Sequence, residues 1–312
     1  PSFTGSFFWA SAGTLRFTDI TLDGNKAAGA SAATAGGFVS SSGSANVTLA
    51  SGTTMRNASS SACGTCLNSA SNSTGTITIE DGATISGCTS SNTYGSAAVG
   101  LWTGSHLVMT GGTITGCSST GGYGSVVSLL GSNITFDMSG GAITGNDAGT
   151  VSPTGDGVIN IDSGTTNTIN LSGTAAITDN DNVGICMWNG SQVNVAGSVN
   201  VSGNTRGGTA ANIVMKTPGT KLGITGTLTS AASIGVTVTA GDHVDGYVFG
   251  VAGSEAVAAA SFGRFTDDRS PALAITYDGA NVKFQSYAYL TVAKNFNGLT
   301  DDNSAPSALF KI

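Results

Sequence analysis

The sequence GATISGC at residues 82–88 is followed by GGTITGC at 111–117 and GGAITGN at 140–146, so one short phrase recurs at a regular spacing. The last apolar residue of the phrase marks the same point in every copy and serves as its anchor. Seven anchors occur in the first two thirds of the chain, namely Leu22, Met55, Ile85, Ile114, Ile143, Ile177 and Val201. Their mean spacing is about thirty residues, and a sustained period of that length indicates a repeat architecture.

Each repeat holds three short segments in which apolar and polar residues alternate, as in strands with one buried face. In one repeat these segments are 76–79, the anchor segment around Ile85, and 99–101. Gly and Ser at the junctions permit tight bends. The sequence therefore predicts an all-β fold, a right-handed parallel β-helix with three strands per coil, in which equivalent strands stack about 4.8 Å apart.

Composition indicates a chain that folds without relying on helices. Of its 312 residues only 9% are charged, 47 are Gly and 39% are hydrophobic, whereas disordered chains combine low hydrophobicity with high net charge. The net charge is −7 and the 11 Lys and Arg form no basic stripe, which disfavours nucleic acid and anionic membranes as partners. No apolar run reaches the roughly 18 residues of a membrane span, so we expect no membrane insertion.

One position in the repeat predicts a buried polar column. It lies three residues after each anchor and is occupied by Asn25, Ala58, Cys88, Cys117, Asn146, Asn180 and Asn204. Stacked Asn side chains can hydrogen-bond along the axis and satisfy a buried turn. We interpret Cys88 and Cys117 as small buried residues. Five cysteines cannot all pair with one another, and a bond between Cys88 and Cys117 or between Cys63 and Cys66 stays open.

These phrases resemble the repeats of the pectin-lyase-like β-helix superfamily. GTLRFTDITLDGNKA at 13–27 and MSGGAITGN at 138–146 resemble in particular the repeats of large Gram-positive surface proteins, and the resemblance covers roughly residues 13 to 220. It implies a β-helix in a secreted, adhesin-type protein attached to the bacterial cell wall through other parts of a longer chain. The superfamily also includes lyases, hydrolases and phage spikes, so the resemblance implies no single activity.

The two ends of the chain depart from the repeat. We expect residues 1–12 to cap the first coil, coils over 13–220, and atypical β coils or a cap over 221–286, because an open solenoid end exposes strand edges. Past Lys221 the pattern is strand-like but out of phase. The longest excursion between coils is expected at 147–157.

Residues 287–312 resemble the first strand of isopeptide-forming stalk and pilin domains of Gram-positive surface proteins. The resemblance implies that Lys294 matches a lysine that bonds to an Asn later in such a domain, and the sequence stops before that Asn, so no bond is expected here. The alternative is a tail packed on the last coil. We expect a monomer that forms part of a longer multidomain chain.

An outward-facing column beside the third strand is the candidate binding surface. Large aromatic side chains that face solvent are uncommon unless they are covered or bind a ligand, and sugars stack on indole faces. The column, with two loop tyrosines, consists of Trp102, Leu130, Asp162, Trp188, Lys216, Tyr94 and Tyr123. The sequence thus predicts a module that binds a glycan or a host surface polymer without a cofactor. Alternatively, the loops at 91–96 and 120–125 fold over this face.

Catalysis on polysaccharide is the main alternative function. A lyase or hydrolase of this fold needs carboxylates that gather Ca²⁺ or activate water, with a basic residue close by. The best acidic cluster consists of Asp147, Asp156, Asp162, Asp179 and Asp181. The nearest basic residue along the chain is Arg206, while His106 and His243 lie elsewhere. We therefore expect these aspartates to accept backbone N–H groups in turns, and we expect no catalytic or metal-binding residue.

Two further alternatives need neither catalysis nor a glycan. An ice-binding solenoid presents Thr-x-Thr ladders, but beside the anchors only 113–115 has that pattern. A passive stalk that projects another domain needs no exposed Trp, which favours the binding module.

Overall fold

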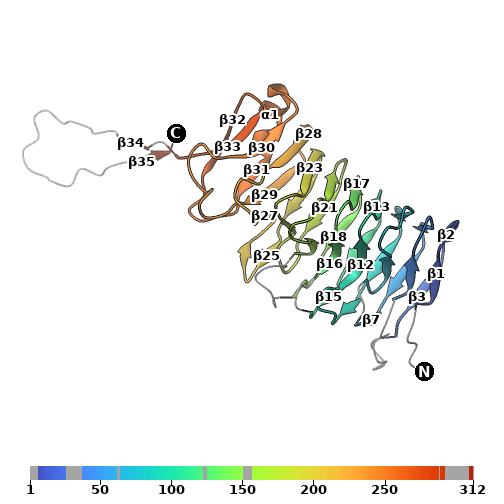
Figure 1. The fold of residues 1–312 in the computed structure, drawn as a ribbon. Coiled ribbons are helices and arrows are strands. Elements are labelled where there is room, and N and C mark those ends of the chain that lie inside the picture. Colours follow the sequence, from blue (N-terminus) through green and yellow to red (C-terminus); the bar gives the residue numbers. More distant parts are fainter. Residues whose placement is uncertain are drawn as a thin grey trace, which may run out of the picture.

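The protein is described by a computed structural model that covers residues 6–25, 37–61, 64–121, 125–149 and 157–287, with the backbone of 289–291 and 309–311. The fold is an all-β parallel solenoid of about 8 turns, with coils of roughly 30 residues and only about 4% helix (Figure 1). The predicted fold class is therefore confirmed.

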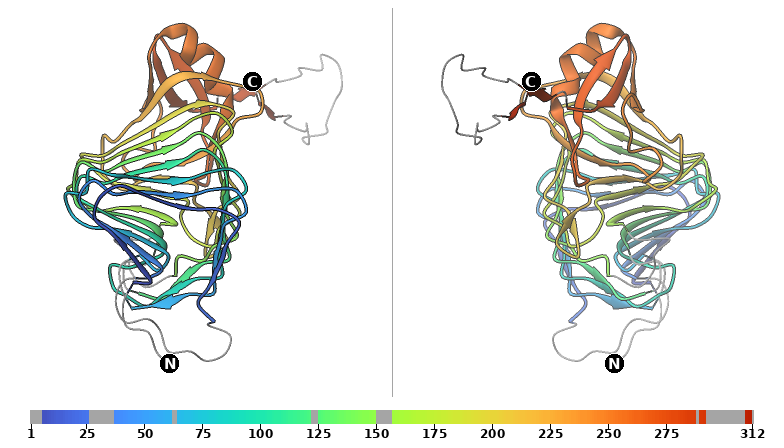
Figure 2. Two further views of the ribbon diagram at one scale, coloured as in Figure 1. Left: turned by 90° about the vertical axis from the view of Figure 1, so that its right-hand side faces the viewer. Right: turned by 90° about the vertical axis from the view of Figure 1, so that its left-hand side faces the viewer.

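Three columns of parallel strands run along the solenoid, and Figure 2 shows the stacked coils nearly end-on. The first face is formed by β2 (Thr14–Phe17), β5 (Asn46–Leu49), β9 (Thr76–Ile79), β13 (His106–Met109), β17 (Thr135–Met138), β20 (Thr168–Leu171), β23 (Gln192–Gly197), β28 (Leu222–Leu228) and β30 (Val248–Ala252). The anchor face is formed by β3 (Thr21–Asp23), β6 (Thr54–Arg56), β10 (Thr84–Ser86), β14 (Thr113–Thr115), β18 (Ala142–Thr144), β21 (Ala176–Thr178) and β24 (Asn200–Ser202). The third face is formed by β1 (Phe8–Ala10), β4 (Val39–Ser41), β8 (Leu67–Ser69), β12 (Ser96–Trp102), β16 (Ser125–Leu130), β19 (Ile159–Ile161), β22 (Ile185–Met187) and β27 (Ile213–Met215).

The seven anchors stack directly on one another. Leu22 is paired with Met55, Ile143 with Ile177, and every anchor between them follows the same register up to Val201. From Met55 onward each anchor is fully buried. Burial of one such side chain is worth about 1.5–3 kcal/mol. The predicted repeat thus sets both the register and the core.

Six successive coils also have a short fourth segment after the anchor strand, from Ser59 to Thr205. In three coils it forms β7 (Ser59–Ser60), β11 (Thr89–Ser90) and β15 (Ser118–Ser119), which pair in parallel. The row continues through single bridges from Ser118 to Asp147, Asp181 and Thr205. These segments hold only Ser, Thr and Asp at the paired positions, so they lack the apolar alternation by which the other three strands are recognised.

Parallel pairing continues past residue 220. β29 (Ser233–Thr237) pairs with both β24 and β27 and so joins the anchor face to the third face, and Ile234 extends the anchor column beyond Val201. β31 (Phe265–Asp267) pairs in turn with β29. Parallel pairing therefore continues after Lys221, although the register shifts between β23 and β28 and one strand, β29, serves two faces.

The solenoid ends in a segment of different structure. A short Ala-rich helix, α1 (Glu255–Ser261), is followed by a 3₁₀ turn (Phe262–Arg264) and by the antiparallel strands β32 (Ala274–Asp278) and β33 (Asn281–Gln285). β33 pairs antiparallel with β30, the last strand of the first face, so the direction of pairing reverses there. The rings of Phe249 and Phe284, 4.7 Å apart, lie within the same buried core.

The N-terminal aromatic residues belong to the first coil. Phe8 and Trp9 lie on β1, which pairs in register with β4, and 69% of Trp9 is exposed. The Phe8 ring contacts Phe17 edge-on at 5.1 Å. At the other end of the chain, β34 (Tyr289–Thr291) and β35 (Leu309–Lys311) pair antiparallel. Lys294 and the excursion predicted after 149 lie outside the described residues.

Candidate functional site

An amide ladder runs inside the turn after the anchor face. Asn146 Nδ2 donates to Asn180 Oδ1 (3.0 Å), and Asn180 Nδ2 donates to Asn204 Oδ1 (2.7 Å). The ladder continues from Asn204 Nδ2 to Asn212 Oδ1 (2.9 Å) and from Asn212 Nδ2 to the carboxylate of Asp268 (3.0 Å). The amides also satisfy buried backbone N–H groups. The side-chain oxygens of Asn180, Asn204 and Asn212 each accept a second bond, from the backbone N–H of the preceding Asn in the ladder.

The other members of the predicted column do not join the ladder. Ala58, Cys88 and Cys117 are buried at equivalent positions without an amide to offer, although the backbone N–H of Cys117 donates to Asn146 Oδ1 (3.0 Å). Asn25 is exposed in a left-handed turn, where its backbone N–H donates to Asp23. The ladder's role is structural.

The column predicted to bind ligand lies at the ends of the third-face strands. Trp102 is paired with Leu130, and the register of the following strands places Asp162, Trp188 and Lys216 at the equivalent position of later coils. Asp162 is exposed, Leu130 is buried, and the other three are half-buried. Of the two loop tyrosines, Tyr94 is 55% exposed and Tyr123 lies outside the described residues.

The outer side of the third face is covered along its middle. A side chain at Gly100 would lie 2.9 Å from the backbone nitrogen of Gly64, and one at Gly157 would lie 3.0 Å from that of Cys186. The segments that precede the third-face strands therefore fold back over that face. This cover comes from the segments around Gly64 and Gly157 and not from the loops at 91–96 and 120–125, of which 122–124 lie outside the described residues.

The Trp188 side chain packs in part against other side chains of the protein. It contacts a small buried cluster on the outer side of the third face, formed with Val214 by Val183, Cys186 and Ala211. Its indole is nevertheless only half-buried. The indole is thus partly packed on the protein and partly exposed.

A shallow depression begins one residue after Trp188, at the corner between the third face and the first face. This corner groove, of about 280 Å³, is lined by 189–192 and 218–221. The two turns are joined by a bond from the Asn189 backbone N–H to Thr217 Oγ1 (3.2 Å). Gln192 and Lys221 supply the longest polar side chains. The groove thus brings amide, hydroxyl and ammonium groups together in the turns that follow Trp188 and Lys216 along the chain, a combination that sequence reasoning missed because the two turns lie on different coils.

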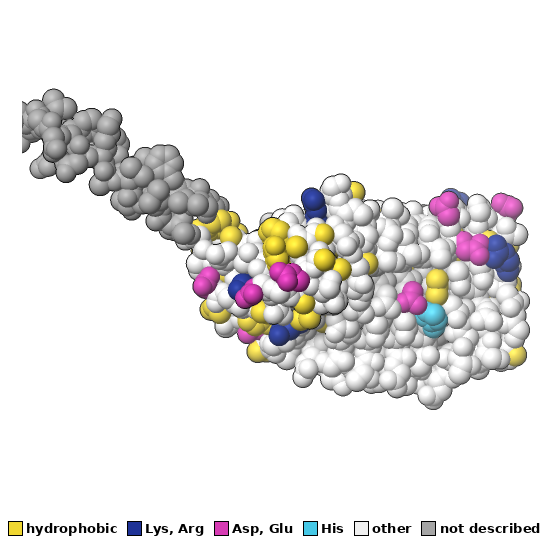
Figure 3. Space-filling view, turned by 90° about the horizontal axis from the view of Figure 1, so that it is seen from above, with side chains coloured by type: hydrophobic (Ala, Val, Ile, Leu, Met, Phe, Trp, Pro, Cys, Tyr) yellow, Lys and Arg dark blue, Asp and Glu magenta, His cyan; other side chains and the backbone are white. Residues whose placement is uncertain are grey.

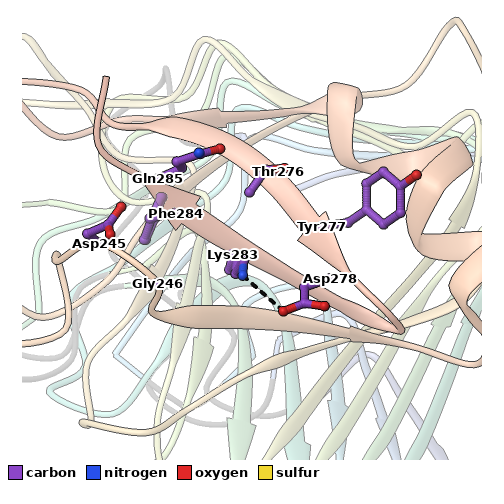
Figure 4. Close-up of a pocket in the computed structure, with 8 residues that line it drawn as sticks. All are labelled: Asp245, Gly246, Thr276, Tyr277, Asp278, Lys283, Phe284 and Gln285. Atoms are coloured by element: carbon purple, nitrogen blue, oxygen red, sulfur yellow. Dashed lines mark hydrogen bonds and ion pairs between the residues drawn. The ribbon is translucent and has the colours of Figure 1, made fainter. Parts of the chain in front are cut away.

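A second depression of about 320 Å³ lies on the antiparallel C-terminal strands (Figure 4). Lys283 Nζ and Asp278 pair across it at 3.1 Å, while the Tyr277 ring points away and packs on Phe262. Asp245, at its edge, accepts the backbone N–H of Ser286 (2.6 Å). Its charged groups are therefore already engaged with one another or with the backbone.

The acidic residues considered for catalysis do not form one cluster. Asp147 and Asp181 are neighbours on adjacent coils, and Asp147 accepts the backbone N–H of Gly149 (2.8 Å). Asp179 occupies a left-handed turn, Asp162 lies at another corner, and Asp156 is outside the described residues. None of the four described aspartates lines either depression.

The two histidines pair with aspartates elsewhere. His106 Nε2 lies 2.8 Å from Asp137 on the first face, where Asp137 also accepts from Asn170. His243 Nε2 lies 2.6 Å from the buried Asp267 in the C-terminal segment. Seen from above, most of the coil surface carries neither charge nor apolar side chains (Figure 3).

Within the described part of the chain, no helix is long and apolar enough to cross a membrane. In the same part, no group of three or more His, Cys, Asp or Glu residues is placed to hold a metal ion. Comparison of the chain with protein-family models, curated proteins and solved structures gave no match.

Proposed function

We propose that the chain is a binding module that recognises a glycan through the corner groove and the row of Trp102, Asp162, Trp188 and Lys216. Leu130, although it belongs to this row, is buried and is not part of the proposed contact. The observation that carries the proposal is a polar groove whose lining begins at Asn189, the residue after the half-buried Trp188. Its place in a surface adhesin rests on the resemblance of the repeats to Gram-positive surface proteins.

The chemistry of the groove suits a sugar. Amide and hydroxyl groups form the directional hydrogen bonds that sugar hydroxyls require, and an indole offers a flat face to the C–H side of a pyranose. Asn189 and Gln192 supply polar groups on one coil, and Thr220 and Lys221 supply them on the next. The buried Ser191 hydroxyl is engaged with the backbone of Thr165 and Asn167. Gly190 and Gly219 leave the backbone uncovered in both turns, so a ligand can approach closely.

The row on the third face extends this contact along the solenoid. Trp102 lies three coils from Trp188, which corresponds to about 14 Å at the spacing of stacked strands. A short glycan would contact only the groove, whereas a longer one would also reach Trp102. We therefore expect affinity to rise with chain length.

The test is binding to a glycan array, followed by titration of the best glycan. Trp188→Ala and Gln192→Ala should each weaken binding about tenfold or more, because each removes a stacking or hydrogen-bonding partner. Trp102→Ala should weaken binding only to long oligosaccharides. Trp9→Ala is the matched control, since this exposed Trp lies on the first coil and should not affect binding.

Two results would contradict the proposal. One is wild-type affinity of the Trp188→Ala and Gln192→Ala variants for every glycan that binds. The other is the release of shorter saccharides on incubation with a bound glycan, which would indicate the lyase or hydrolase alternative.

A further inference from the structure

Two buried thiols lie in contact where the amide ladder has ended. Cys66 Sγ and Cys88 Sγ are 3.0 Å apart, both side chains are fully buried, and neither is in a disulfide. Cys66 lies immediately before β8, and Cys88 follows β10 on the next coil. The pair therefore connects two adjacent coils through the core.

The thiols only partly replace the amides of the ladder. Cys88 Sγ donates to the carbonyl of Ser86 (3.3 Å), as Asn146 Nδ2 does to that of Thr144 (3.1 Å). A thiol is a weak donor and a weak acceptor, however, so it cannot also hold the backbone N–H of the neighbouring coil as an Asn oxygen does. Among the described residues from β6 to β14, this turn thus lacks the side-chain amide bonds that join the later coils, although the strands themselves remain paired.

We propose that Cys66 and Cys88 form a disulfide bond when the protein folds under oxidising conditions, and that this bond joins adjacent coils where the ladder is absent. The sulfur atoms need to approach by only about 1 Å to reach the length of a disulfide. Cys186 is on the outer side of the third face, packed with Val183 and Ala211, and is not part of this pair.

The reaction is a thiol–disulfide exchange with a disulfide oxidant such as oxidised glutathione. One thiol loses its proton and attacks the oxidant, releasing one thiol of the oxidant. The second protein thiolate then attacks the mixed disulfide and releases the other. Two protein thiols are oxidised to one disulfide and the oxidant is reduced to two thiols. Burial raises the pKa of the Cys66 thiol, so reaction during folding is favoured over reaction in the native state.

The bond can be located with two proteases. Arg56, Glu80 and Arg206 are the only Lys, Arg or Glu residues between 56 and 206, so trypsin with a Glu-specific protease yields peptides 57–80 and 81–206. Cys66 lies in the first peptide, while Cys88 and Cys117 lie in the second. A Cys66–Cys88 bond joins the two peptides, whereas a Cys88–Cys117 bond stays within one.

The experiment refolds a chain carrying Cys63→Ala and Cys186→Ala with oxidised glutathione, alkylates free thiols after denaturation, digests and measures peptide masses. We expect the two peptides to be joined, with one alkylated thiol at Cys117. The link should persist with Cys117→Ala added and disappear with Cys66→Ala or Cys88→Ala. Oxidation should raise the melting temperature of the linked protein by on the order of 5 °C.

Alkylation of both Cys66 and Cys88 after oxidative refolding would overturn the proposal, as would a bond confined to peptide 81–206. Joined peptides in which Cys88 and not Cys117 is alkylated would also overturn it, because Cys66 would then be paired with Cys117. Circular dichroism of each variant under reducing conditions establishes that the compared chains are folded.

Discussion

At the scale of single residues, the amide ladder shows how one polar side chain can serve a buried turn in a repeat. The side-chain oxygens of Asn180, Asn204 and Asn212 each accept two bonds. The side-chain nitrogen of each Asn donates to the next member of the ladder, so every member needs an acceptor there. At the C-terminal end that acceptor is Asp268, which receives both the backbone and the side-chain N–H of Asn212. A carboxylate suits this place because it can accept from several donors without donating itself.

The end of the ladder makes stability depend on pH. Burial raises the pKa of Asp268 above its ordinary value, although the bonds from Asn212 oppose the shift and the neighbouring Asp267 adds to it. A carboxyl whose pKa is raised on folding stabilises the fold while it is protonated. That contribution is complete below the ordinary Asp pKa of about 4 and is lost as the pH rises through the raised pKa.

We expect Asp268→Asn to remove this component of the pH dependence. An Asn oxygen at this place can accept both bonds from Asn212, as Asn180 Oδ1 does from Asn146. Chemical denaturation of both proteins from pH 3 to pH 8 measures the effect. The free energy of unfolding of the wild type should fall relative to the variant as pH rises over this window. If the free energies of unfolding of the two proteins changed in parallel with pH, the pKa of Asp268 would be the same in the folded and unfolded states.

At the scale of elements, the strands of the first and anchor faces follow directly from their alternating residues, whereas the third face does not. β12 is buried on both sides although its sequence, SAAVGLW, does not show what covers it. The cover is the segment around Gly64, whose backbone lies against Gly100. Because that segment has no periodicity, its path over the sheet cannot be read from the repeat.

Gly100→Val tests this cover. The new Cβ would lie 2.9 Å from the Gly64 nitrogen and 3.1 Å from its Cα, closer than packed atoms tolerate. We expect a loss of about 1–3 kcal/mol in the free energy of unfolding from overpacking. The control is Thr78→Val, which faces outward on the uncovered first face and should change stability by roughly 0.5 kcal/mol or less. Urea denaturation of both variants measures the difference, and equal values would show that the segment does not press on β12.

At the scale of the whole molecule, the solenoid is a stack in which each coil contacts mainly its neighbours. Its folding unit is therefore one coil, and the chain should tolerate loss of a coil but not of part of one. A deletion that removes one whole coil must begin and end at equivalent positions of two successive coils, which the anchors mark. Ile85 and Ile114 occupy the same place on successive coils.

Deletion of residues 85–113 joins Thr84 to Ile114 and restores the register one coil shorter. We expect this variant to keep the β-sheet circular dichroism spectrum and cooperative unfolding, with lower stability because one coil of buried core is lost. Deletion of 85–99 instead removes an anchor strand and leaves the third strand in its place, so this variant should not fold. If the two deletions behaved alike, the coil would not be the repeating unit.

The parallel solenoid, its period and the inward column from Leu22 to Val201 can be predicted from the sequence, because alternation along a strand fixes which side chains are buried. The repeat also places Asn146, Asn180 and Asn204 at one position of the turn. The three-dimensional structure was needed to show that Asn212 and Asp268 complete the ladder, that Cys66 contacts Cys88, and that the turns after Trp188 and Lys216 form a polar groove. These contacts join segments on different coils through turns of variable length. A repeat pattern carries no information on the path of such turns, whereas packing of the coils fixes it.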